Sequence, residues 1–220
     1  MPVTGLYFCP DSGTTQNLAA AIVDRLSKRY QPTSTAKWSL EHRLLRENGP
    51  PSSSSAATPS LQAPVTQTPP QTRYMQYLDL SFHPGKRFCL VDKSIVTIDP
   101  DFEHILTAKL QGLWSMRLTL KADGNILELE DFKIKIATLS QGSVIKGVLM
   151  EVEYLPCAYL EQGEGVIRDF IEQLELPNGP NVRYYFSQAP VGPSADGNDE
   201  PREFSILDTG MQYMELLRLR

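Results

Sequence analysis

The chain has 220 residues, a formal net charge of −5 at pH 7 and 41% hydrophobic residues, which is enough for one sizeable core. The acidic balance disfavours direct nucleic-acid binding, because proteins that follow phosphates usually present a basic face. Three widely spaced cysteines indicate reducing surroundings, and no apolar run is long enough for a membrane span. Because residues 1–8 also lack the features of a signal peptide, we expect a soluble protein of the nucleus or cytosol.

The first part of the chain alternates between strand and helix patterns. Residues 3–8 predict a short strand, and apolar residues at helical spacing predict an amphipathic helix over residues 14–29. Alternation with a period of two predicts a half-buried strand over residues 36–45. Residues 47–73 are rich in Ser and Pro and have no periodicity. They predict a disordered insert within the domain, because such a segment buries too little apolar surface to offset its chain entropy.

The middle of the chain predicts mostly sheet. Asp99-Pro100 is typical of a helix start and predicts a short helix after it. Asp123-Gly124 predicts a hairpin turn. We expect strands at 74–82, two short strands within 86–98, and further strands at 114–120, 126–130, 132–139 and 144–154.

The last part of the chain predicts a helix over 166–174, a strand over 182–186, a second polar insert over 188–202 and a closing helix over 209–218. Asp208 or Thr209 is the expected cap of the closing helix, and Thr209 with Gln212 fits a capping box. Its apolar residues cover most of its circumference, so we expect it to pack on more than one side. The pattern as a whole predicts one α+β domain over residues 1–220: a predominantly antiparallel, β-barrel-like sheet, closed or nearly closed, with peripheral helices.

No catalytic constellation is visible in the sequence. The three histidines, His42, His83 and His104, do not lie at metal-ligand spacing from one another or from a cysteine. Phosphate-binding loops, nucleophile elbows and dinucleotide-binding turns are also missing. We therefore predict a protein that is not an enzyme and that has no catalytic residue, cofactor or metal.

Two acidic patterns in the strands resemble part of a metal-binding motif. Glu128 and Glu130, and again Glu151 and Glu153, place two carboxylates on one face of a strand. Glu-x-Glu strands that face into a barrel can hold a divalent cation against a triphosphate. The motif of such enzymes continues to a lysine, and Leu155 occupies that position here. We expect a solvated or partner-facing acidic edge, with a metal-dependent triphosphatase-like enzyme as an alternative.

Two longer motifs resemble one known family. Residues 151–157 (Glu-Val-Glu-Tyr-Leu-Pro-Cys) resemble the Val-Glu-Val-Glu-Tyr-x-Pro-Cys stretch of the Mediator subunit 20 family. Residues 208–216 (Asp-Thr-Gly-Met-Gln-Tyr-Met-Glu-Leu) are similar to the closing helix of that family, and Pro2-Val3-Thr4 to its opening. The resemblance covers most of the chain outside the two inserts.

The resemblance implies a β-barrel subunit of the Mediator head module in the nucleus. It implies pairing with the similar barrel of Mediator subunit 18, a tether through the C-terminal helix of subunit 8, and contacts with other head-module subunits. Through the pair, the protein would contact the RNA polymerase II initiation machinery and help to link regulators to it. No catalytic residues come with the family, and it implies neither a small-molecule substrate nor direct nucleic-acid contact.

The residues themselves also favour an interaction role. In the strand over 144–154, Ile145 and Leu149 stand opposite Val148 and Met150, which indicates burial on two faces and hence a partner. The partner-interface candidates are Ile145, Leu149, Glu151, Glu153, Met211, Met214 and Leu217. A second alternative, a stand-alone barrel that binds a small molecule, remains open because fold alone does not decide function.

Overall fold

The computed structural model describes residues 1–11, 13, 17–48, 72–177, 181–190 and 201–218. Most of both predicted inserts, 47–73 and 188–202, lies outside these residues. The described residues form nine strands and four helices: β1 (Val3–Pro10), α1 (Leu18–Tyr30), β2 (Ser34–Glu47), β3 (Tyr74–Leu80), β4 (Arg87–Val91), β5 (Ser94–Ile98), α2 (Phe102–Ala108), β6 (Trp114–Glu128), β7 (Phe132–Gln141), β8 (Val144–Tyr154), α3 (Leu160–Gln173), β9 (Arg183–Tyr185) and α4 (Ile206–Leu216).

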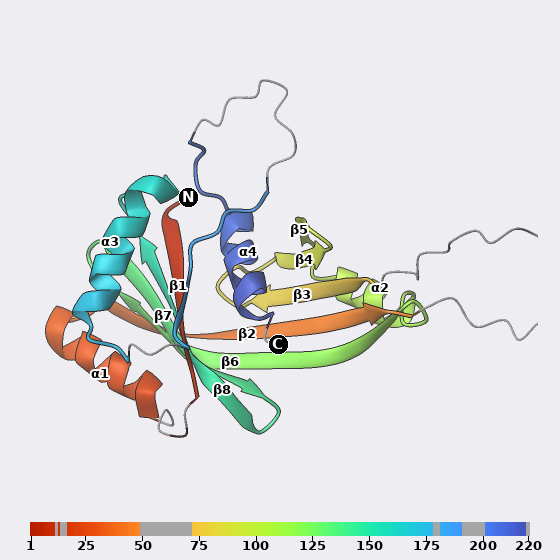
Figure 1. Cartoon of the computed structure of the whole chain (residues 1–220), viewed down its shortest axis with the longest axis horizontal. Helices are drawn as coiled ribbons and strands as arrows, with labels where there is room; N and C mark the ends of the chain where they lie inside the picture. Colours follow the sequence, from red (N-terminus) through yellow and green to blue (C-terminus); the bar gives the residue numbers. More distant parts are fainter. Residues whose placement is uncertain (12, 14–16, 49–71, 178–180, 191–200, 219–220) are drawn as a thin grey trace, which may run out of the picture.

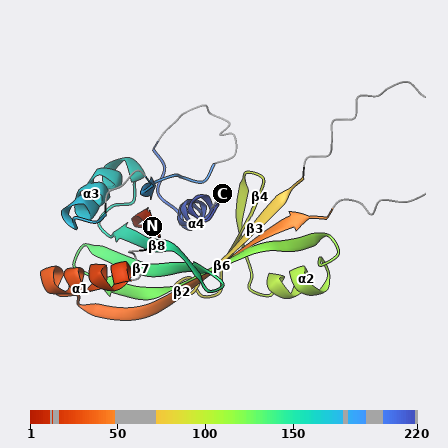
Figure 2. The ribbon, with the colours of Figure 1, turned by 60° about the horizontal axis from the view of Figure 1, so that its bottom comes forward.

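All nine strands belong to one sheet, in the order β5-β4-β3-β2-β6-β7-β8-β1-β9. Every neighbouring pair is antiparallel. The predicted α+β class and the barrel-like antiparallel sheet are therefore confirmed. The sheet is strongly curved but not closed, since β5 and β9 form its two ends (Figures 1 and 2).

Helices cover both faces of the sheet. On the inner face, α4 packs against apolar side chains from β1 through β8 in one continuous core. On the outer face, α1 and α3 cover one half of the sheet and α2 covers the other half, around β2, β3 and β4 (Figure 2). The alternation in β8 shows this directly, because Leu149 joins the core around α4 whereas Val148 and Met150 join the core under α1 and α3. The expected burial of β8 on two faces is present, and the chain's own helices provide it.

The predicted turn at Asp123-Gly124 is wrong. Strand β6 runs straight through this dipeptide, and Gly124 pairs with Trp38 of β2 on one side and Ala137 of β7 on the other. A Cβ atom built on Gly124 would lie 1.8 Å from the carbonyl oxygen of Ile136. The glycine therefore permits a close approach of neighbouring strands, which is the other common reason for glycine inside a strand.

A bulge changes the alternation in β8. The register between β7 and β8 shifts at Leu139 and Ser140, so that Ile145 lies opposite Ser140 and Leu149 lies opposite Ala137. Because Ala137 and Ser140 are an odd number of residues apart, they point to opposite faces. Ile145 and Leu149 thus do not share a face, contrary to the simple alternation expected from the sequence.

None of the helices in the described residues combines the length and the apolar character needed to cross a membrane.

Candidate functional site

Helix α4 begins with a buried capping arrangement. Ser205 is the N-cap, and Asp208, at the third helical position, completes a capping box with it. The backbone N–H and the hydroxyl of Ser205 donate to Asp208 Oδ2 at 2.7 and 2.8 Å, and Arg202 Nη1 donates to the same oxygen at 2.8 Å. The prediction that Asp208 or Thr209 is the N-cap is therefore wrong, because the helix begins about one turn earlier. The helix starts earlier because Ser205 and Asp208 have the spacing that a capping box requires.

The polar side of α4 is anchored to β1, at the other end of the sequence. Gln212 Nε2 donates to the backbone carbonyl of Thr4 at 2.9 Å, and the Thr4 hydroxyl donates to Gln212 Oε1 at 2.9 Å. The hydroxyl of Thr209 lies 3.3 Å from that of Thr4. All three side chains are buried, so these hydrogen bonds satisfy groups that would be costly to leave unpaired inside the protein.

A buried ion pair lies beside this anchor. Lys135 Nζ of β7 contacts the carboxylate of Glu151 in β8 and lies 3.1 Å from Glu153 Oε2. The hydroxyl of Tyr213 in α4 donates to Glu151 Oε2 at 2.5 Å. Lys135 Nζ also lies 4.2 Å from the ring centroid of Phe82. The side chains of Lys135 and Glu151 are only 3% and 1% exposed, so the inner face holds a desolvated charge pair with Tyr213 as a third member.

The protonation of this cluster follows from its surroundings. Burial and then the neighbouring Glu151 carboxylate hold the pKa of Tyr213 well above its usual value, so its hydroxyl remains a donor. Burial by itself acts to lower the pKa of Lys135, but the carboxylates of Glu151 and Glu153 outweigh it and raise that pKa. Lys135 therefore stays positively charged. It neutralises carboxylate charge that a bound metal ion would need.

The structure corrects the interpretation of the acidic patterns. Glu151 is fully buried between Lys135 and Tyr213, so it is not part of a solvated edge. Glu128 lies at the end of β6, where Lys133 pairs with it at 2.7 Å. Glu130 lies beyond the end of that strand and is exposed. The two Glu-x-Glu pairs therefore do not combine into one carboxylate cluster, and no group of three or more His, Cys, Asp or Glu side chains suited to a metal ion occurs in the described ranges.

The interface candidates fall into two groups. Four of them are buried in the chain's own core: Leu149, Glu151, Met214 and Leu217. They are buried because α4 covers the inner face of the sheet. Ile145, Glu153 and Met211 are partly exposed and remain predicted interface residues.

Several residues of the α4 anchor have almost no signal in the local sequence pattern. Thr4 and Lys135 are buried polar residues of β1 and β7, and both point inward. The signal that the sequence does contain is the placement of two lysines, Lys133 and Lys135, on one face of β7. In the antiparallel register, Lys135 lies opposite Glu151 and Lys133 lies opposite Glu153. Opposite charges at directly paired positions stabilise a sheet, but the register must be known first.

His42 gives a pH-dependent stability that can be tested. Its Nε2 lies 3.0 Å from Gln76 Oε1, while Nδ1 has no hydrogen-bond partner within the described structure. Burial lowers the pKa of His42 to about 4, although the Gln76 contact acts in the opposite direction. An unfolded chain has a histidine pKa of about 6.5 and so binds a proton that the folded chain does not. The free energy of unfolding is therefore undiminished by His42 above about pH 6.5. It falls by about 3 kcal/mol as the pH is lowered to about 4.

We expect urea denaturation between pH 7 and pH 4.5 to give a smaller pH slope for His42→Gln than for the unmodified chain. His104, which is exposed on α2, supplies the control, and His104→Gln should keep the original slope. Equal slopes for all three proteins would contradict this explanation.

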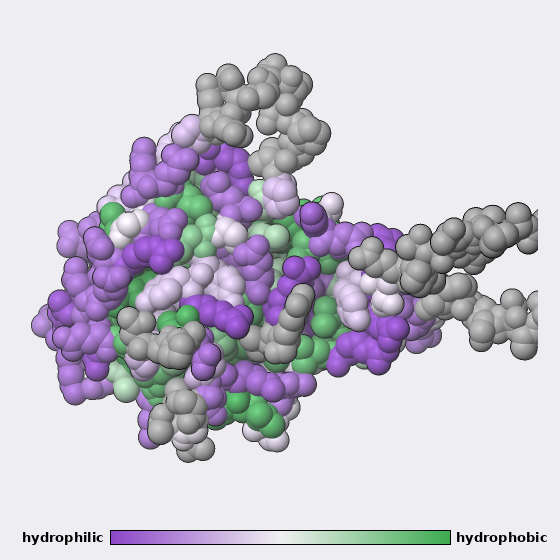
Figure 3. Space-filling view, in the orientation of Figure 1, coloured by the Kyte–Doolittle hydropathy of each residue, from purple (hydrophilic) through white to green (hydrophobic). Residues whose placement is uncertain are grey.

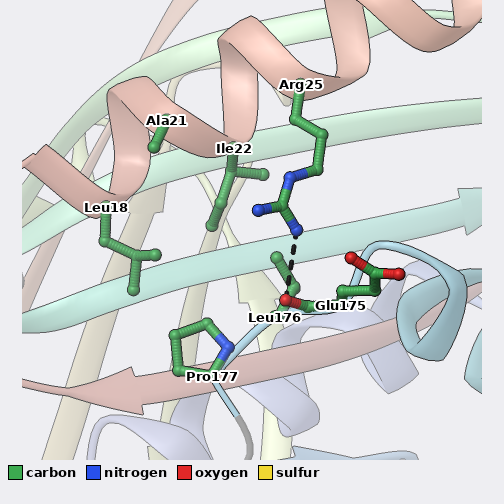
Figure 4. A pocket seen from close by; sticks show the side chains of 7 residues that line it. All are labelled: Leu18, Ala21, Ile22, Arg25, Glu175, Leu176 and Pro177. Atoms are coloured by element: carbon green, nitrogen blue, oxygen red, sulfur yellow. Dashed lines mark hydrogen bonds between the residues drawn. The ribbon is translucent and has the colours of Figure 1, made fainter.

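Two clefts lie on the outer face near α1 and α3. The smaller, about 260 Å³, is bounded by Leu18, Ile22, Leu176 and Pro177. Arg25 reaches across it and donates to the carbonyl of Glu175 at 3.1 Å (Figure 4). The larger cleft, about 480 Å³, lies between Tyr30, Phe132 and Phe170.

Comparison with known proteins places these features in a family. The sequence model of a family described as TATA-binding related factor (TRF) of subunit 20 of Mediator complex matches residues 1–218. The chain is 25% identical over 182 residues to the Mediator of RNA polymerase II transcription subunit 20 of Schizosaccharomyces pombe, covering 83% of this chain and 82% of that protein. It is 27% identical over 147 residues to the mouse protein of the same name, covering 66% of this chain and 64% of that protein. A chain in the structure of the S. pombe Mediator head module aligns with a TM-score of 0.37 and 12% identity, over 79% of this chain and 95% of that chain.

Proposed function

Because the chain belongs to the Mediator subunit 20 family, we propose that it acts in the nucleus as a non-enzymatic subunit of the Mediator head module. In this role it pairs with the barrel of subunit 18, is tethered by the C-terminal helix of subunit 8 and contacts other head-module subunits. Through them it helps to connect regulators with the RNA polymerase II initiation machinery.

One observation carries this proposal: α4 fills the inner face of the sheet. The two motifs that resemble the family meet there, since Glu151 of residues 151–157 accepts a hydrogen bond from Tyr213 of residues 208–216. A triphosphatase-like enzyme would use this inner space for metal and substrate, and a ligand-binding barrel would use it for a small molecule. Here the space contains the helix and a charge pair with its own partners. The chain is therefore better suited to act through its outer surfaces.

The heterodimer can be tested with the subunit 18 of the same organism. We expect light scattering after mixing to give a 1:1 complex, and Ile145→Asp to weaken it roughly tenfold or more if Ile145 lies at the centre of the interface. Val96→Asp is the control, because Val96 is 50% exposed on β5 at the far end of the sheet. A chain that remains a monomer in the presence of subunit 18 would refute the pairing. A complex equally weakened by both substitutions would remove Ile145 from the interface.

A further inference from the structure

The larger cleft on the outer face has an aromatic floor. The ring of Phe132, at the start of β7, stacks on Phe170 of α3 with centroids 4.4 Å apart. Tyr30, the last residue of α1, packs against Phe170 at 5.5 Å. Phe170 is buried, whereas Tyr30 and Phe132 are only partly buried, so ring surface from α1 and β7 remains accessible in a space of about 480 Å³. This volume falls within the range of about 300–1,000 Å³ that is typical of ligand sites.

Carboxylates form the rim of this cleft. Glu130 and Asp131 come from the turn between β6 and β7, and Asp169 comes from α3. All three residues are exposed, and none of them is in an ion pair with any residue that the structure describes. We call this site the acidic aromatic cleft, defined by Tyr30, Phe132 and Phe170 on its floor and Glu130, Asp131 and Asp169 on its rim.

The nearby cations already have partners. Arg29 donates to the carbonyl of Gln173 at 2.7 Å, and its guanidinium lies 5.3 Å from the Tyr30 ring centroid. Lys133 pairs with Glu128 at 2.7 Å. The Gln173 carbonyl is neutral, so Arg29 offsets one of the three rim charges and covers one face of Tyr30, and the rim keeps an excess of negative charge.

Apolar surface continues from the cleft. Val166 lines it from α3 and is 37% exposed. Leu155 follows β8, is 41% exposed, and its N–H donates to the carbonyl of Asp131 at 2.9 Å. In Figure 3 the outer surfaces of the helices at the left are mostly hydrophilic, and hydrophobic surface shows between them. Two partly exposed apolar side chains thus lie near the rim carboxylates and offer contacts to an apolar neighbour of a basic residue.

We propose that the acidic aromatic cleft binds a short segment of another protein in which an arginine or lysine stands beside a large apolar residue. The cation would pair with the rim carboxylates beside the partly exposed edges of Tyr30 and Phe132, while the apolar neighbour would cover Val166. Phosphate-bearing ligands are disfavoured by the same carboxylates. The cleft contains none of the interface residues predicted for the heterodimer, so it is a separate surface and does not depend on that pairing.

Selection from a random 12-residue peptide library displayed on phage tests the proposal on the whole chain. We expect the enriched peptides to carry Arg or Lys next to Leu, Phe or Trp. Their affinity, measured by fluorescence anisotropy at low salt, should fall roughly fivefold or more on Asp131→Asn with Asp169→Asn, since each exposed charge contact contributes a modest amount.

A matched control removes the same charge elsewhere on the same side of the molecule. Asp24 and Glu172 are exposed on α1 and α3 but do not line the cleft. Asp24→Asn with Glu172→Gln should change peptide affinity less than about twofold. Val166→Lys, at an exposed helix position, should also abolish selection by placing a like charge beside the bound cation.

The proposal would be overturned by no enrichment of any peptide, by enrichment without basic residues, or by equal affinity for the two charge variants. Self-association of the unmodified chain that is lost in Asp131→Asn with Asp169→Asn would instead assign the cleft to a second copy of this chain, and the proposal would fail.

Discussion

Replacing Lys135 with Met should destabilise the folded chain by about 3–5 kcal/mol, the usual cost of removing one partner from a buried ion pair. The substitution removes the cation but keeps most of the side-chain volume, so packing changes little. Glu151 would then be left as a buried carboxylate with only the Tyr213 hydroxyl to compensate it. Urea denaturation at neutral pH measures the difference, since a loss of this size moves the midpoint well beyond experimental error.

Lys133→Met is the matched control for this experiment. Lys133 is on the same strand, two residues away, and also pairs with a glutamate, but its side chain is 32% exposed. We expect it to cost less than about 1 kcal/mol, as solvent-exposed pairs usually do. Adding Glu151→Leu to Lys135→Met should recover part of the lost stability, because it removes the isolated charge. Similar losses of stability for Lys133→Met and Lys135→Met would contradict the explanation that burial of the ion pair sets the cost of removing its cation.

Met214→Ala and Leu217→Ala should each cost about 2–5 kcal/mol, because both side chains are buried in the core between α4 and the sheet. Truncation leaves a cavity there, and the surrounding strands are held by their own ladder hydrogen bonds and relax only partly. The loss should appear in the isolated chain, before any partner is added, as a lower midpoint in denaturant with little change in slope.

Met211→Ala tests whether the loss of stability depends on how deeply a side chain of α4 is buried. Met211 belongs to the same helix but is only partly buried, so its truncation should cost clearly less. If Met214→Ala left stability unchanged and only weakened binding to subunit 18, α4 would be an interface helix rather than a core helix. Equal effects of Met211→Ala and Met214→Ala would show that the burial difference has no energetic consequence.

Local periodicity predicted most elements of the fold correctly. The two short strands around Asp92-Lys93 and the helix after Asp99-Pro100 are present as β4, β5 and α2. The predictions failed where the same local pattern is compatible with two different structures. Gly124 permits close strand packing instead of a turn, and the bulge in β8 reverses the alternation that assigned Ile145 to a face. These features depend on the neighbouring strand, which a local pattern does not contain.

The candidate site was less predictable for the same reason. Glu151 and Met214 were named as partner-interface candidates, and their burial depends on contacts between elements far apart in the sequence. Thr4 and Gln212, for example, are 208 positions apart and exchange two hydrogen bonds. No spacing rule connects such residues, whereas Ser205 and Asp208 form a local capping box that a closer reading of the sequence could have found.

The attachment of α4 to β1 has a consequence for synthesis on the ribosome. Strand β1 is made first but its neighbours in the sheet, β8 and β9, follow more than a hundred residues later, and α4 is made after all nine strands. Until α4 has emerged, the apolar inner face that it covers has no partner within the chain, and the Lys135–Glu151 pair lacks Tyr213. Contacts between distant residues form slowly and leave hydrophobic surface exposed in the meantime. The nascent protein is therefore most exposed to aggregation and to chaperone binding in the interval after the strands have been made and before α4 has left the ribosome.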